Sequence, residues 1–205
     1  MKEPKSQRDC DRKARRRLQV LDAAAECFRR EGLHGSSIAR ISRAAGMSAG
    51  HIYHYFENKE AIVEAIAVRE QANMDRLVKK LERQESGNNV SARLARYAAE
   101  ALERSRRPEA VGLMLELAAE AARNPTIADA LQRTDQAIGK RFVELVRREG
   151  HLTNLSVEGA WLRMSMIAAL MQGLSMRSVI DPRSDRVQIA QLLSRVIDAM
   201  LDDSH

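Results

Sequence analysis

The sequence predicts an all-α protein of about nine helices, and three observations lead to that prediction. Segments rich in Ala, Leu, Glu and Arg repeat their apolar residues with the 3.6-residue period of a helix. There is no alternating run of β-branched residues and no Asn-Gly or Asp-Gly hairpin turn. The four prolines, at positions 4, 108, 125 and 182, lie outside the periodic segments or at their edges, where helices begin or end.

The first two helices have clear end signals. The first is expected over residues 13–30, with Gly32 just past its end as a C-cap. The second begins at the Ser36-Ser37 pair, where a hydroxyl can cap the first backbone N–H groups, and it ends at Gly46. The residues expected to face inward are Leu18, Leu21, Ala25, Phe28, Ile38, Ile41 and Ala45.

The third helix is expected to begin after Ser48 and to end near Phe56. The fourth starts at Asn58, a good N-cap, and continues without a breaker to about Gln84, which is longer than the usual helix of ~10 to 14 residues. Residues 87–89, Gly-Asn-Asn, form the clearest internal linker. Further helices are expected at about 90–106, 109–123, 126–149, 156–179 and 185–203.

Composition limits the classes of protein that this chain can belong to. With 205 residues, 44% of them hydrophobic, it has enough apolar material for a core. No stretch approaches the ~18 to 20 apolar residues of a spanning helix. The first 17 residues hold eight Lys or Arg with no apolar segment after them, so no secretory signal is expected. Two cysteines, Cys10 and Cys27, are too few for a disulfide framework or a zinc cluster, and we expect a cytoplasmic protein with no membrane partner.

The positive charge is concentrated near the N-terminus. Residues 1–60 hold 13 Lys or Arg against 8 Asp or Glu, whereas residues 61–205 hold 21 against 20, so that nearly all of the net charge of +6 lies in the first third. Four of the seven aromatic residues lie in the same third. A basic module with aromatic residues, followed by a nearly neutral remainder, indicates a polyanion as the partner of the first part.

Residues 37–56, SIARISRAAGMSAGHIYHYF, have the pattern of a helix-turn-helix. The second helix of such a motif lies in the DNA major groove, which is about 12 Å wide and admits one helix. Ile52 and Phe56, at i and i+4, are expected to anchor this helix to the core. Gly50 costs ~1 kcal/mol of helix propensity, which a close approach to the DNA backbone would explain. The residues left to face outward are Ala49, Gly50, His51, Tyr53 and His54.

These residues closely resemble those of the TetR family of bacterial transcriptional repressors. The likeness covers VLDAAAECFRREG in the first helix and SSIARISRAAGMSAGHIYHYFENKEAI from the second into the fourth. It implies that Tyr53 and Lys59 hold DNA phosphates and that Ser37 caps the second helix. It further implies that the groove is faced by Ser48, Ala49, Gly50, His51 and His54. The sequence departs from the family pattern at Ala49, where Lys or another polar residue is frequent, and at His51, where Thr is usual.

Other interpretations of the same residues remain open. Tyr53 could be an ordinary half-buried aromatic residue, and His51 with His54 could form half of a metal site, although no third ligand lies at a suitable spacing, so that neither metal nor cofactor is expected. The basic run around residues 12–17 is either a solvated tail or an arm that touches DNA. Arg40 and Arg43 are candidates for phosphate contacts or plain surface charges.

The resemblance divides the chain into a basic flexible arm (1–13), a helix-turn-helix DNA-binding domain (14–74) and a helical domain for dimerisation and effector binding (75–205). In the last predicted helix the apolar residues cover an arc of roughly 200°, wider than the ~100° that packing against one core requires. The surplus indicates either a second apolar partner or a helix buried within one subunit. The resemblance implies the former, with residues 156–179 and 185–203 forming a four-helix bundle across a two-fold axis.

Methionines crowd the helix that carries Trp161. Because Met side chains adapt to irregular shapes, they suit an apolar effector pocket, but at helical spacing they also suit a core or a dimer interface. Trp161 and Tyr97 combine an apolar body with a polar group, which is useful in a pocket. The candidate pocket residues are Met74, Tyr97, Met114, Trp161, Met164 and Met171.

The sequence has neither a Gly-rich phosphate loop nor HExxH, and the spacing of Glu116 and Glu120 is expected by chance in a chain with 28 acidic residues. We therefore expect a non-enzyme, namely a homodimeric repressor that binds a palindromic operator and is released by a small apolar or amphipathic effector through the long fourth helix. The alternatives are a DNA-binding regulator without a ligand, a DNA-binding protein without sequence preference, an all-α enzyme, and an interaction module with a vestigial DNA-binding part.

Overall fold

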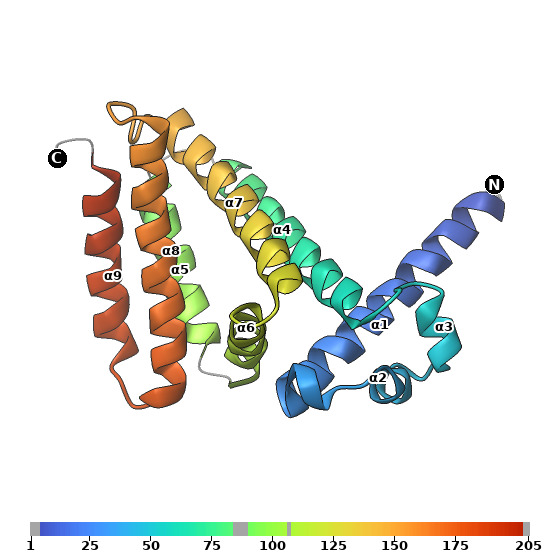
Figure 1. Cartoon of the computed structure of the whole chain (residues 1–205). Coiled ribbons are helices and arrows are strands. Elements are labelled where there is room, and N and C mark those ends of the chain that lie inside the picture. The colour runs from blue at the N-terminus through green and yellow to red at the C-terminus, as the bar shows by residue number, and fades with distance from the viewer. Residues whose placement is uncertain (1–4, 84–89, 106–107, 203–205) are drawn as a thin grey trace. The chain divides into compact units, whose positions relative to one another are not determined.

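The computed structural model describes the backbone of residues 5–83, 90–105 and 108–202, and over these ranges it contains nine helices and no strand (Figure 1). The all-α prediction is therefore confirmed. The helices are α1 (Lys5–Gly35), α2 (Ile38–Ala45), α3 (Ala49–Tyr53), α4 (Lys59–Arg83), α5 (Val90–Arg104), α6 (Pro108–Ala121), α7 (Pro125–Arg148), α8 (Val157–Ile180) and α9 (Arg186–Leu201).

Most helix ends agree with the sequence prediction to within a few residues, and three differ. Helix α1 ends at Gly35 and not near residue 30, although Gly32, the predicted C-cap, does interrupt it with a non-helical backbone (φ 74°, ψ 165°). Helix α1 begins at Lys5 and not near residue 13, because no Pro or Gly interrupts residues 5–13. Helix α3 ends at Tyr53 and not near Phe56, since the chain continues in a turn. The predicted linker at 87–89 and the first four residues of the predicted arm lie outside the described residues.

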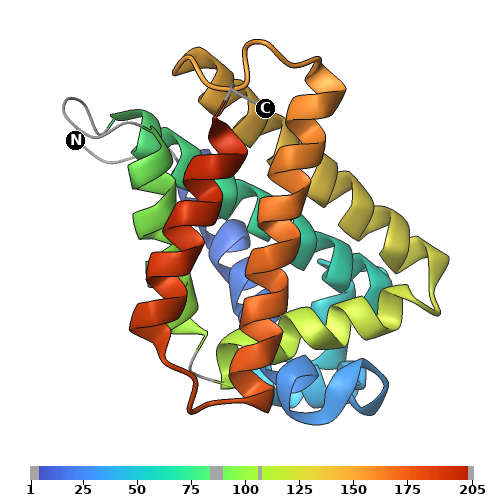
Figure 2. The same cartoon turned by 90° about the vertical axis from the view of Figure 1, so that its left-hand side faces the viewer.

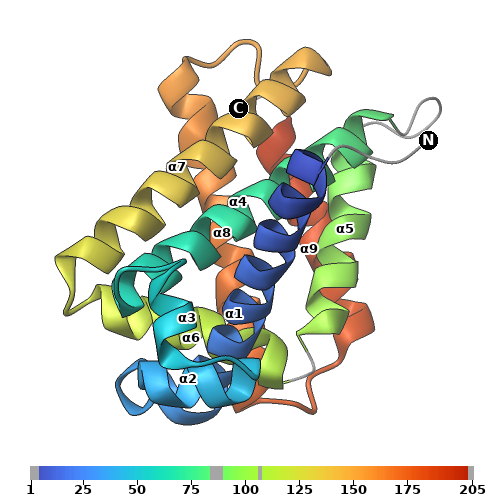
Figure 3. The same cartoon turned by 90° about the vertical axis from the view of Figure 1, so that its right-hand side faces the viewer.

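The first compact unit comprises the chain up to Arg69 together with Gly112–Leu131. Helix α2 packs against α1, and α3 packs against α2 (Figure 3). Phe28 is fully buried at the centre of the core, and Leu117 of α6 and Ile127 of α7 belong to the same cluster. The other fully buried large residues of this core are Leu33, Ile41, Ile52, Ile62 and Ile66.

One inward-facing prediction in this unit is wrong. Leu18 is 49% exposed, whereas Leu21, Ala25 and Phe28 on the same face of α1 are buried. Among the described residues of α1, burial begins only at Val20, because the core does not extend to the earlier turns of this long helix.

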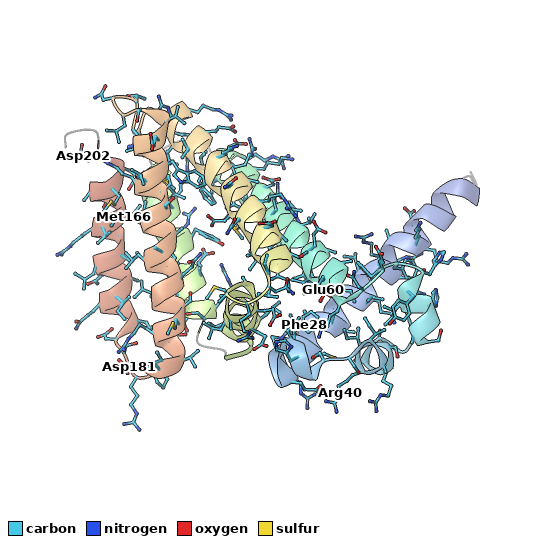
Figure 4. All side chains as sticks on the ribbon, in the orientation of Figure 1. Phe28, Arg40, Glu60, Met166, Asp181 and Asp202 are labelled. Carbon is cyan, nitrogen blue, oxygen red and sulfur yellow. The ribbon has the colours of Figure 1, made fainter. Side chains whose placement is uncertain are left out.

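The second compact unit comprises Glu70–Val111 together with the chain from Gln132 onward. Helix α9 packs against both α5 and α8. Figure 2 shows α8 and α9 side by side, and in Figure 4 Asp181, which follows α8, and Asp202, which follows α9, lie at opposite ends of this pair of helices. Ser156 caps the start of α8, and Asp185 accepts hydrogen bonds from two backbone N–H groups at the start of α9. The short connection between these helices makes them antiparallel neighbours.

The two units do not follow a single cut in the chain. Helix α4 passes from the first unit into the second after Arg69, a few residues before the boundary that the sequence suggests between residues 74 and 75. Residues 112–131, from α6 and the start of α7, cluster with the first unit. None of the described helices combines the length and apolar character that a membrane crossing requires.

Candidate nucleic-acid interface

Side-chain caps and one glycine define the helix-turn-helix. Ser37 accepts a hydrogen bond from the backbone N–H of Arg40 (3.2 Å) and so begins α2. Gly46 ends α2 with a φ of 61°, in the left-handed region that glycine adopts without a steric penalty. Ser48 then accepts from the backbone N–H of His51 (3.2 Å) and begins α3. The local sequence thus fixes where both helices begin, as expected.

Helix α3 has one buried face and one exposed face. Ile52 is fully buried and Phe56, in the following turn, is only 3% exposed, so these two residues fasten the segment to the core of the first unit. Tyr53 is 55% exposed. Gly50, His51 and His54 are also exposed, and Ala49 is partly exposed. The arrangement leaves a short polar and aromatic face that can enter a groove while the apolar face holds it in place.

Lys59 is held at the point where α4 begins. Its ammonium donates to the carbonyl oxygen of Leu33 (2.8 Å), while the backbone N–H of Leu33 donates to a carboxylate oxygen of Glu116 on α6 (2.6 Å). An ammonium has three donors, so this bond leaves Lys59 able to bind a phosphate. Asn58 caps α4 by accepting from the N–H of Ala61 (2.7 Å).

Gly32 makes the contact between Leu33 and Glu116 possible. Its φ is +74°, and an added Cβ would lie 2.9 Å from a carboxylate oxygen of Glu116. Both the backbone conformation and the close approach of a side chain therefore favour glycine at this position.

Tyr55 joins the two histidines of the motif. Its hydroxyl lies 3.3 Å from Nε2 of His51, and the two rings stack with centroids 5.3 Å apart. The ring of His54 meets the ring of Tyr55 edge-on, with 5.2 Å between the two centroids. Tyr55 itself packs partly against the core. Its position thus fixes the surroundings of both His51 and His54.

The arginines around the motif have different environments. Arg17 lies over the ring of Phe56, 4.7 Å from its centroid, in a cation–π contact. Arg40 forms an ion pair with Glu31 (2.5 Å), so part of its charge is already neutralised. Arg43 is exposed in the last turn of α2. Arg40, which is labelled on α2 in Figure 4, is exposed.

An ion-pair cluster around Glu120 links α1 to α6. Glu120, whose side chain is 6% exposed, lies 2.9 Å from His34 and 3.0 Å from Arg123. Burial raises the pKa of Glu120, but the hydrogen bond from Arg123 and the charges of His34 and Arg123 outweigh it, so that the pKa lies below its ordinary value. Glu120 is therefore an ionised, buried contact between helices of the first unit.

The described residues hold neither a cluster suited to a metal ion nor a readily ionised thiol. Within the part of the chain that the structure describes, there is no cluster of three or more His, Cys, Asp or Glu side chains that could hold a metal ion. Burial raises the pKa of the Cys27 thiol, which keeps it protonated at neutral pH.

The candidate effector residues are divided between the two units. Met114 is exposed on α6 in the first unit, and the others lie in the second. The hydroxyl of Tyr97 lies 4.0 Å from the sulfur of Met74, and burial raises the pKa of Tyr97. Met164 is buried in the second core, where Trp161 and Met171 are partly buried. A groove of about 530 Å³ between α5 and α9 is lined by other residues, among them Ala95, Leu102 and Arg186.

Sequence reasoning left three contributors out of the candidate site. Glu116 reaches the backbone of Leu33 from a distant helix, and Arg17 reaches Phe56, so neither pairing has a local sequence signal. Tyr55 could have been found, because it stands four residues after His51, the spacing at which side chains meet on a helix.

The capped helix-turn-helix, with its anchored α3 and exposed Tyr53, defines the class: a DNA-binding transcription regulator. Two family models match the chain: bacterial regulatory proteins of the tetR family over residues 20–66, and the C-terminal part of BetI-type transcriptional repressors over residues 90–202. The second match covers more than half of the chain. The protein belongs to the TetR family, as the sequence resemblance implied.

Individual relatives agree with this assignment. The HTH-type transcriptional regulator UidR of Escherichia coli K12 is 30% identical over 134 residues, which are 64% of each chain. The structure of Salmonella enterica GusR has a TM-score of 0.74 at 25% identity, covering 91% of this chain and 95% of that one. The structure of the transcriptional regulator FadR from Bacillus subtilis in complex with stearoyl-CoA has a TM-score of 0.68 at 20% identity, covering 92% and 99%. UidR is named as a transcriptional regulator, in agreement with the expectation of a non-enzyme.

Proposed function

We propose that the protein is a homodimeric, ligand-responsive transcriptional repressor that acts in the cytoplasm on a palindromic operator. The observation that carries the proposal is the face of α3: Tyr53, His51 and His54 are exposed, while Ile52 and Phe56 are buried beneath them. Ser37, Ser48, Ala49, Gly50 and Lys59 complete the proposed DNA-binding set. Tyr53 and Lys59 hold phosphates, and the residues around His51 face the base edges.

An exposed apolar face on α8 and α9 supports the dimer. Six exposed residues of α8, all apolar or glycine, are spaced alternately four and three apart, the spacing of a helix-packing seam. Leu162, Met166 and Ile180 on this face are each about 60% exposed, and so is Leu192 on α9. A monomer rarely exposes so continuous an apolar stripe, and a second copy would cover it. The α8 members are Leu162, Met166, Ala169, Gly173, Met176 and Ile180.

The effector is proposed to be a small apolar or amphipathic molecule that binds in the second unit. The FadR structure with stearoyl-CoA supports this class of ligand, because that regulator of similar fold holds a molecule with a long apolar chain. Met74, Tyr97, Trp161, Met164 and Met171 offer adaptable apolar surface in that unit, and Met114 offers it on α6.

Helix α4 is the proposed link between the two activities. It begins at Lys59, next to the DNA-binding motif, and continues without interruption to Arg83 in the second unit. A ligand that displaces α4 moves Lys59 and the recognition helices away from successive major grooves. By linkage, ligand and DNA must then weaken each other by the same factor, typically about 5-fold to 150-fold.

The experiment that tests the proposal is a titration at fixed salt of a fluorescent operator fragment with the purified protein, with stoichiometry measured by sedimentation. Two chains per palindromic site, and reciprocal weakening between DNA and a ligand found by thermal-shift screening, support the proposal. Binding by a monomer refutes the dimer, and a ligand that binds free and DNA-bound protein equally refutes the coupling. A regulator without a ligand gives tight operator binding and no ligand hit. A protein without sequence preference gives a steep salt dependence and equal affinity for all DNA.

A further inference from the structure

Tyr55 occupies a position from which it controls the side chain that faces the bases. It stands one turn after His51, and its hydroxyl lies 3.3 Å from Nε2 of that imidazole. The two rings are stacked with 30° between their planes and 5.3 Å between their centroids. His51 is exposed, whereas Tyr55 is partly buried and packs against the core of the first unit. A mobile surface ring is thereby fastened to a fixed one.

We propose that Tyr55 is the positioning residue for DNA sequence readout, holding the imidazole of His51 in one orientation at the groove-facing surface. The inference rests on the proposed operator binding and adds to it the residue that makes His51 selective. Tyr55 does not itself need to touch a base in order to act in this way.

The hydrogen bond also restricts which atoms His51 can offer. Whichever of the two partners donates, Nε2 is occupied by the Tyr55 hydroxyl, and Nδ1 is the ring nitrogen that remains for a partner on the DNA. An imidazole with one free nitrogen in a fixed direction can bond only to the base-edge atoms that lie in that direction, which restricts the base pairs it accepts. A freely rotating imidazole would bind several base pairs with similar affinity.

The gain from this arrangement is pre-organisation. A side chain that is already ordered in the free protein loses less conformational entropy when it binds, which is a common source of affinity in tight interfaces. His54, whose ring meets Tyr55 edge-on at 5.2 Å, limits the movement of the tyrosine from another side. The three rings thus form one ordered aromatic group on α3 and the turn that follows it.

The test compares Tyr55→Phe with Tyr53→Phe, a matched control that removes the same hydroxyl from a residue two positions earlier. Affinities are measured for the operator, for single-base-pair variants of it and for random DNA, at one salt concentration. We expect Tyr55→Phe to weaken operator binding by about threefold to tenfold, the range for immobilising one side chain on binding, and to leave binding to random DNA unchanged. Tyr53→Phe is expected to weaken binding to all three kinds of DNA by the same factor.

A double-mutant cycle with His51→Ala completes the experiment. If Tyr55 acts through His51, Tyr55→Phe causes no further loss of specificity in the His51→Ala background, and both variants relax preference at the same base pair. Additive losses, an equal loss on operator and random DNA, or an unchanged operator affinity for Tyr55→Phe would each overturn the inference.

Two further measurements separate the possible causes of a negative result. The thermal midpoint of each variant shows whether it folds. If Tyr55→Phe does not fold, the variant His51→Phe tests the same contact from the other residue. It keeps an aromatic ring stacked on Tyr55 and removes the nitrogen atom that bonds to the Tyr55 hydroxyl. It should lose as much specificity as His51→Ala, and retained specificity would refute the inference. A wild-type protein without preference for any sequence would refute the proposed function itself, whereas a selective wild type with an equally selective Tyr55→Phe variant refutes only the role of Tyr55.

Discussion

Ile52 and Tyr53 are neighbours on α3 with opposite environments, and replacing each by alanine should separate stability from DNA binding. Ile52 is fully buried in the first core, whereas Tyr53 is 55% exposed. Truncating a buried Ile to Ala typically costs about 2 to 5 kcal/mol, because apolar contacts are lost and a cavity remains. Truncating an exposed side chain usually changes the free energy of unfolding by less than about 0.5 kcal/mol.

The expected magnitudes follow from these environments. For a chain of 205 residues, each 1 kcal/mol lowers the thermal midpoint by about 2 to 4 °C, so Ile52→Ala should lower it by roughly 4 to 20 °C. Tyr53→Ala should leave the midpoint within about 2 °C of the wild type. A hydrogen bond to a charged phosphate contributes about 1.5 to 3 kcal/mol, so Tyr53→Ala should weaken binding to every DNA sequence by about 10-fold to 150-fold.

Circular dichroism melting gives the first quantity and fluorescence anisotropy with labelled DNA gives the second, both on the full chain. A midpoint that falls as far for Tyr53→Ala as for Ile52→Ala would contradict the two-faced arrangement of α3. Unchanged DNA affinity for a folded Tyr53→Ala variant would remove Tyr53 from the interface.

Four further changes probe other parts of the structure. Lys59→Gln should weaken binding to all DNA and lower the slope of log affinity against log salt by about 1, as measured by anisotropy at several salt concentrations; an unchanged slope would leave Lys59 with only its contact to the α1 backbone. Met166→Glu should convert the proposed dimer to a folded monomer in sedimentation, and a persistent dimer would place the interface elsewhere. Gly139→Ala should lower the free energy of unfolding by about 1 kcal/mol and shift the fluorescence of Trp161, because the new Cβ would lie 2.2 Å from that ring and the strain exceeds the gain in helix propensity; a stabilised variant would contradict this packing. The folded-state pKa of Glu120 lies below its ordinary value of 4.5, so the carboxylate stabilises the protein above about pH 4.5 and loses this effect as the pH falls through the folded-state pKa. Denaturant titrations should therefore show that Glu120→Gln is less stable than the wild type at pH 7 and that the difference is much smaller at pH 3. An equal loss of stability at both pH values would refute the ionic role of Glu120.

Local signals made most of the fold predictable from the sequence. Ser37, Gly46, Ser48 and Asn58 each act through backbone groups within a few residues, and each ends or begins a helix where the sequence places that boundary. The same holds for Ile52 and for Phe56 in the turn after α3, whose spacing of four residues puts both on the buried face.

The remaining features depend on contacts that periodicity does not encode. Leu18 fits the apolar period of α1 but is exposed, because the period does not tell how far along the helix the core reaches. The bonds that Leu33 makes with Lys59 and Glu116 join three separate helices, so they appear only in the folded chain. The candidate effector residues have in common only that they are methionines or aromatic residues, and side-chain type alone does not distinguish a core from a ligand site.

Selection of binding sites from a random pool of double-stranded DNA by the wild-type protein, with His51→Ala as the comparison, tests most directly whether α3 reads an operator. We expect the wild type to enrich an inverted repeat with half-sites centred about one helical turn apart, or a multiple of it, and we expect His51→Ala to enrich the same repeat with relaxed preference at one base pair of each half-site. A wild-type pool that stays random, or a His51→Ala motif with unchanged preference at every base pair, would contradict the claim that α3 reads the bases through His51.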